Sequence, residues 1–227
     1  MSPIDPRTLV DARLELHHAV QLLAMFGQAC VPARDDDSHR SMTWDGGRRA
    51  FRSEPSPAGI RVWLRPADLT VSVGSREHEA AALSLVGRTL DEAVAWLAEA
   101  LADVGGAERP ALTWPEYDLP DHPVRHGAAF SGGSEGHLRD LEARYHEAAA
   151  LLDDLAGAEP HATPVRCWPH HFDIATLLLL DPEFGAADGR SVGVGMSPGD
   201  QGYPEPYWYV TPYPYPDLAG EPPPLPP

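Results

Sequence analysis

The sequence predicts an α+β fold, in which about three main helices pack on a mostly antiparallel sheet. Apolar residues recur at helical spacing in some stretches and alternate with polar residues in others, and the two kinds of stretch come in blocks. The chain has 227 residues, of which 43% are hydrophobic, so it can bury a core without disulfides or metals. We expect one α+β domain over residues 7–216 and a proline-rich, disordered tail at 217–227.

Three helices are predicted from the spacing of apolar residues. The second is marked by a capping box, because Thr89 and Glu92 can each satisfy a backbone N–H of the other. Ser134 is the predicted N-cap of the third, which Gly157 and Pro160 end. The helices are expected at residues 8–27, 89–105 and 134–157.

Alternating apolar residues predict the strands. Residues 60–64 and 69–73 alternate on either side of Arg65-Pro-Ala-Asp68, so they are expected to form an antiparallel hairpin. The run Leu177–Leu180 is apolar at every position, which predicts that residues 172–180 form a central strand with both faces covered. The other strands are expected at residues 42–51, 80–86, 165–168, 191–196 and 206–211.

Charge and composition argue against several classes of function. The net charge is −17 and all 17 basic residues are arginines, which disfavours binding to nucleic acid or to an anionic membrane. No stretch approaches the ~20 apolar residues of a membrane span, and the N-terminal MSPIDPRTLVDARLE lacks the regions of a signal peptide. Cys30 and Cys167 are expected to be reduced thiols. We therefore expect a cytoplasmic protein, whose oligomeric state the sequence leaves open.

The stretch WPHHFD, residues 168–173, places polar side chains at the start of the predicted central strand. Alternation along that strand puts His171 and Asp173 on one face. An imidazole and a carboxylate so placed can share a metal ion, or the carboxylate can orient the imidazole for acid–base catalysis. The alternative is that these side chains satisfy backbone groups where the strand begins.

Two later stretches add candidate residues. Ser197-Pro-Gly-Asp200 predicts a type II turn that fixes Asp200 at the end of a strand, although a plain solvent turn is equally consistent. In PEPYWYV, prolines hold Glu205 in extended chain at a sheet edge, and alternation places Glu205, Tyr207 and Tyr209 on one face. The two tyrosines either form the wall of a pocket or belong to the core.

On the first predicted helix, His17 and Gln21 are one turn apart and face the same way. A histidine on a mostly apolar helix is more often a satisfied core residue than a ligand. The candidates are thus assigned as follows: catalytic residues His171, Asp173, Glu205 and Asp200; cofactor-binding residues His17, Gln21, Tyr207 and Tyr209; metal ligands His171 and Asp173.

The motifs WPHHFDIA, GxGxSPGD and PEPYWYV, in this order, resemble a family of bacterial proteins that is known as a domain of unknown function. The resemblance is strong over residues 160–216, modest over 8–27, where Leu16–Gln21 is similar to an LHxxxQ stretch, and weak between. It implies no activity. It does favour a functional site over an accidental gathering of polar residues.

Three hypotheses follow. The first is a metal-assisted or acid–base enzyme that acts on a small molecule; zinc, iron or manganese would suit the mixed ligands. The second is a non-catalytic protein that binds a small molecule in an aromatic pocket. The third is an interaction scaffold that offers its edge strand and proline-rich tail to a protein partner. The chain has no HExxH motif, nucleophile elbow or dinucleotide fingerprint that would select a reaction.

Overall fold

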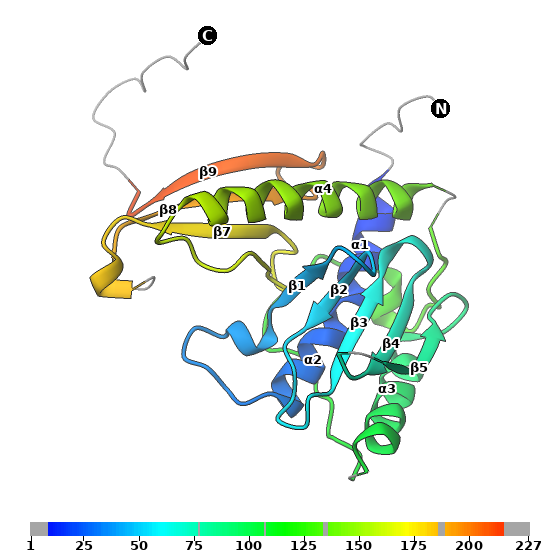
Figure 1. Ribbon diagram of the computed structural model, residues 1–227. Coiled ribbons are helices and arrows are strands. Elements are labelled where there is room, and N and C mark those ends of the chain that lie inside the picture. Colours follow the sequence, from blue (N-terminus) through cyan, green and yellow to red (C-terminus); the bar gives the residue numbers. More distant parts are fainter. Residues whose placement is uncertain (1–8, 77, 107, 134–135, 186–188, 216–227) are drawn as a thin grey trace.

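The computed structural model describes residues 9–76, 78–106, 108–133, 136–185 and 189–215. These residues form one nine-stranded sheet with the order β5-β4-β3-β2-β1-β6-β7-β8-β9 (Figure 1). Every pair of neighbouring strands is antiparallel. This confirms the predicted α+β class. The strands are β1 (Met42–Asp45), β2 (Ala50–Ser53), β3 (Arg61–Arg65), β4 (Thr70–Gly74), β5 (Glu79–Ser84), β6 (Arg166–Cys167), β7 (Ile174–Leu179), β8 (Ser191–Ser197) and β9 (Tyr207–Tyr213).

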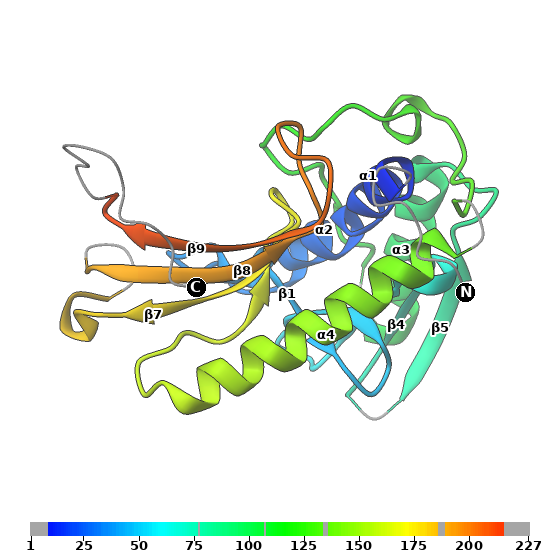
Figure 2. The same ribbon diagram turned by 90° about the horizontal axis from the view of Figure 1, so that it is seen from above.

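The helices pack against the sheet and against one another. The predicted N-terminal helix is observed as two segments that only Val20 separates, and both are largely buried. α2 and α3 contact β2 to β5, while α4 packs on β7 and β8 (Figure 2). The α-helices are α1 (Leu9–Ala19), α2 (Gln21–Cys30), α3 (Leu90–Gly105) and α4 (His137–Ala158). In the described part of the chain, no helix is long and apolar enough to cross a membrane.

Several local predictions are confirmed. Thr89 and Glu92 form the capping box at the start of α3. β3 and β4 form the predicted hairpin, in which Val62 pairs with Val73 and the chain reverses through Pro66–Asp68. Neither cysteine forms a disulfide.

Other boundaries differ from prediction. Residues 42–51 form a hairpin of β1 and β2 rather than one strand, because residues 46–49 make a turn and Arg49 has a φ of 51°. α4 begins at His137 after Gly136, which supplies no side-chain cap. Ser134, the predicted cap, lies outside the described residues, as do residues 7, 8, 216 and the tail 217–227.

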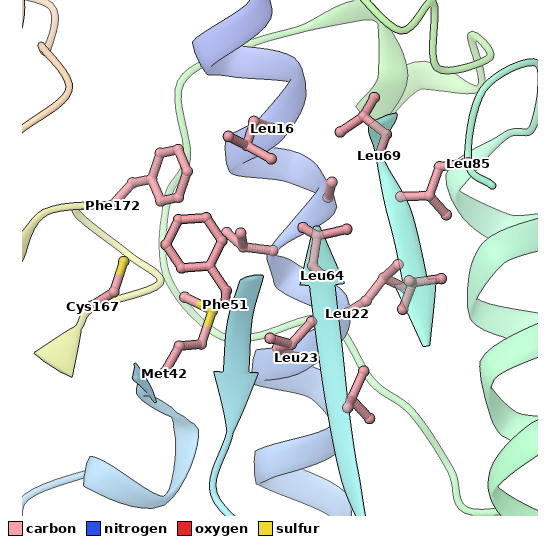
Figure 3. Close-up of a cluster of buried hydrophobic side chains, with 14 of the residues drawn as sticks. Leu16, Leu22, Leu23, Met42, Phe51, Leu64, Leu69, Leu85, Cys167 and Phe172 are labelled. Carbon is pink, nitrogen blue, oxygen red and sulfur yellow. The ribbon is translucent and has the colours of Figure 1, made fainter. Parts of the chain in front are cut away.

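The core joins the helices to the sheet through a cluster of buried hydrophobic side chains, which includes the rings of Phe51 and Phe172 (Figure 3). Phe51 of β2 lies 4.7 Å from Tyr145 of α4 and 5.6 Å from Phe172, measured between ring centroids. All three side chains are fully buried. Burial of rings of this size contributes strongly to stability, so the loop that carries Phe172 is anchored in the core.

β7 is an interior strand, as predicted, since it pairs with both β6 and β8. Its two faces are not equally covered, however. Ile174 points to the same face as Met196 of β8 and is buried there, on the side where α4 packs. Leu177 is only partly buried on the opposite face, and Leu180, beyond the strand, is 56% exposed. The expectation that Leu177–Leu180 is covered on both faces is therefore wrong, because a cleft opens on one side.

Candidate functional site

A cleft of about 1290 Å³ lies over the face of β7, β8 and β9 that α4 leaves open. The strand register places Ala175, Gly195 and Tyr209 side by side on this face. Ala175 on β7 and Gly193 on β8 form the floor of the cleft, and the tyrosines along β9 form one of its walls. The rest of the lining comes from α1, the loop between β6 and β7, the turn after β8, Asp36, Pro120 and residues 163–166. A concave site with a largely apolar lining and a few polar groups is typical of small-molecule binding.

The WPHH segment forms the tight loop that joins β6 to β7. Trp168 N–H donates to the Asp173 carbonyl at 3.0 Å, and Phe172 N–H donates to the Trp168 carbonyl at 2.7 Å. Phe172 has a φ of 61°, in the left-handed region. Strand alternation therefore does not extend back to the histidines, contrary to the prediction. His171 is exposed, and its ring lies 4.2 Å from that of half-buried His170 at the cleft.

His17 and Gln21 hold this loop in place. His17 Nε2 lies 2.8 Å from the carbonyl oxygen of Pro169, and Gln21 Nε2 donates to the same oxygen at 2.8 Å. Gln21 also donates to the His17 carbonyl and accepts a hydrogen bond from the Tyr117 hydroxyl at 2.6 Å. Burial lowers the pKa of His17 to about 4, so the ring is neutral at neutral pH and Nε2 carries the proton. Both side chains act structurally, and His17 alone of the two lines the cleft.

Asp173 and Tyr209 meet at the floor of the cleft. The Tyr209 hydroxyl donates a hydrogen bond to Asp173 Oδ2. Burial and the charge of Asp173 raise the pKa of Tyr209, so the phenol stays protonated. To reach Asp173, the Tyr209 ring crosses Gly195, where a Cβ atom would lie 2.5 Å from the hydroxyl oxygen and 2.8 Å from Ala175 Cβ. The other carboxylate oxygen, Oδ1, is buried and makes no hydrogen bond to any residue that the structure describes.

The predicted type II turn at Ser197–Asp200 is supported by a φ of 105° at Gly199. Asp200 is held by three donors, the backbone N–H groups of Gly202 and Tyr203, both at 2.7 Å, and the Tyr207 hydroxyl at 2.6 Å. The hydrogen bond from Tyr207 is the main cause that lowers the pKa of Asp200. Asp200 and Tyr207 line the cleft, whereas Glu205 lies in the loop before β9, outside the lining.

The residue that sequence reasoning missed is Arg13. It lies on α1 one turn before His17 and lines the cleft, yet its exposed fraction is only 6%. Nε and Nη1 are buried and make no hydrogen bond to any described residue. The turn lies against the guanidinium, since a Cβ atom on Gly199 would be 2.4 Å from Nη1. The polar stripe Arg13, His17 and Gln21, at helical spacing on an apolar helix, was the signal available in the sequence.

The lining therefore unites His17, His171, Asp173, Asp200, Tyr207 and Tyr209 of the predicted site residues, and leaves out Gln21 and Glu205. Within the described ranges, no three His, Cys, Asp or Glu side chains lie close enough to hold a metal ion. The sequence predicted two metal ligands, His171 and Asp173, and metal binding by them stays a prediction.

Comparison of the chain with protein-family models, with curated proteins and with solved structures finds no match. The resemblance to the bacterial family stays a prediction as well. Any statement on function has to come from the cleft itself.

Proposed function

We propose that the protein binds a small molecule in the cleft over β7, β8 and β9. The observation that carries this proposal is the buried guanidinium of Arg13 at the cleft. Burying a charge without a hydrogen-bonded partner is costly, so folded proteins rarely keep one without a reason. A ligand that completes the coordination of Arg13 supplies that reason.

The lining supports binding more strongly than acid–base catalysis. Of the four predicted catalytic residues, Asp200 already accepts three hydrogen bonds, His171 is exposed and Glu205 lies outside the cleft. Asp173 has a buried oxygen that makes no hydrogen bond to any described residue. Acid–base catalysis usually needs two groups that exchange protons with the substrate. Among the described residues, no hydrogen bond links the Asp173 carboxylate to His170 or His171, the two imidazoles of its loop that also line the cleft.

The floor of the cleft offers a direct test. A Cβ atom on Gly193 would make ordinary contacts, 3.5 Å to Leu177 and 3.6 Å to Thr211, so Gly193→Leu can fill the cleft without moving the strand. Val210→Leu places the same residue on the opposite face of the sheet, where Val210 is 69% exposed. We expect aromatic fragments, screened by ligand-observed NMR, to bind the wild-type and Val210→Leu proteins and to lose binding to Gly193→Leu.

Circular dichroism and melting curves of the two variants provide the control for folding. If a folded Gly193→Leu protein binds the fragments as the wild type does, the ligand site lies elsewhere. If no fragment binds the wild-type protein, the cleft is not a small-molecule site.

A further inference from the structure

The charges around the cleft restrict what its ligand can be. The described lining contains two arginines, Arg13 and Arg166, and three aspartates, Asp36, Asp173 and Asp200. Arg166 already donates to Ser41 Oγ at 2.9 Å and to Glu54 Oε1 at 3.0 Å. A ligand with only negative charge would meet the repulsion of the aspartates, and one with only positive charge would leave Arg13 unpaired.

Two charged side chains of the described lining, opposite in sign, keep buried polar atoms without a hydrogen-bond partner. Arg13 makes no hydrogen bond to a described residue through Nε or Nη1, and Asp173 makes none through Oδ1. Both residues line the same cleft. They form no ion pair with each other among the described residues.

Neighbouring residues of the described structure do not satisfy the remaining hydrogen-bonding atoms of Arg13 and Asp173. Asp200 acts on Arg13 at a distance, but its oxygens are taken by Tyr207 and by two backbone N–H groups. Tyr209 satisfies one oxygen of Asp173 and not the other. An added molecule with an acceptor and a donor would satisfy both residues.

From this arrangement we infer that the ligand is a small amino carboxylate. Its carboxylate binds Arg13, its protonated amine binds Asp173, and its apolar part lies along Tyr207, Tyr209 and Leu177. Guanidinium–carboxylate and ammonium–carboxylate hydrogen bonds are charge-assisted and therefore among the stronger ones. This inference rests on the proposed function, because it assigns the ligand class of the same cleft.

The test uses aromatic amino carboxylates in which the two charged groups are spaced differently: L-phenylalanine, 3-(aminomethyl)benzoate and 4-(aminomethyl)benzoate. Each is compared with its carboxamide, which lacks the negative charge, and with the analogue that lacks the amine. Dissociation constants are measured by protein-observed NMR at millimolar concentrations. For at least one probe, we expect removal of either charge to weaken binding about tenfold or more, the usual effect of a charge-assisted hydrogen bond.

Two variants assign each charge to its residue. In Arg13→Met the probe and its carboxamide should bind equally, and in Asp173→Asn the probe and its amine-free analogue should bind equally. Gly193→Leu should abolish binding of every probe and every analogue. A carboxylate effect that persists in Arg13→Met, or an amine effect that persists in Asp173→Asn, overturns the inference.

The failure of this inference is distinguishable from the failure of the proposed function. If the carboxamides or the amine-free analogues bind in the cleft and no amino carboxylate binds more tightly than they do, the ligand class is wrong and the binding site stands. If none of the probes and no fragment binds the wild-type protein, both proposals fail.

Discussion

Replacing Gln21 with leucine is expected to lower the free energy of unfolding by about 3 kcal/mol, because three buried hydrogen bonds are lost and polar partners are left unsatisfied. The side chain is fully buried, donates to the carbonyls of His17 and Pro169, and accepts from Tyr117. Leucine is of similar size, so the loss would come from hydrogen bonding rather than from a cavity. Urea-induced unfolding followed by circular dichroism measures the change.

Gln28→Leu is the matched control on the same helix. Gln28 is exposed and makes one side-chain hydrogen bond, to Thr113 at 3.2 Å. Its replacement should change stability by less than about 0.5 kcal/mol, as is usual for surface substitutions. Equal effects of the two substitutions would show that Gln21 does not hold the loop at Pro169.

Gly195→Ala is expected to lower the free energy of unfolding by about 2–4 kcal/mol, because the added methyl group overpacks the site and breaks the Tyr209–Asp173 hydrogen bond. The added Cβ would lie 2.5 Å from the Tyr209 hydroxyl oxygen and 2.8 Å from Ala175 Cβ. Tyr209 can swing away, but Asp173 then loses its donor; Ala175 moves only if the strand moves. The midpoint of thermal unfolding and the Tyr209 ring signals in NMR report both consequences.

Gly193→Ala tests whether this effect is specific. The two glycines lie on the same strand and the same face, and a Cβ atom on Gly193 would lie 3.5 Å from Leu177 Cδ2, its nearest contact among the described residues. We expect Gly193→Ala to fold with nearly wild-type stability. If Gly195→Ala is equally stable, Tyr209 does not cross the strand as described.

The sequence predicted those parts of the fold whose signals lie close together in the chain. The capping box of α3 and the β3–β4 hairpin each depend on a few neighbouring residues, and both were placed correctly. The start of β7 was misjudged because alternation was extended through His170 and His171, whereas the chain makes a loop there and Phe172 adopts a positive φ.

The site was only partly predictable, because its contacts span the chain. His17 and Pro169 are 152 positions apart, and no local pattern indicates that the histidine would form a hydrogen bond with a backbone carbonyl. Tyr209 and Tyr207 were placed on the correct face by strand alternation, and both line the cleft. Arg13 was missed since an arginine on a helix normally reaches solvent, and its burial depends on the Ser197–Asp200 turn.

If Arg13 is buried in order to bind a ligand and not to stabilise the fold, its replacement should not destabilise the ligand-free protein. The free energy of unfolding of Arg13→Met, measured in the absence of ligand, tests this. Arg166→Met is the control, because Arg166 also lines the cleft but is paired with Glu54 and Ser41. Removing a buried guanidinium whose Nε and Nη1 make no hydrogen bond to any described residue should leave stability unchanged or raise it by about 1 kcal/mol, whereas removing a hydrogen-bonded one should cost about 1–3 kcal/mol. A loss for Arg13→Met as large as that for Arg166→Met would contradict the account, because Arg13 would then stabilise the fold itself.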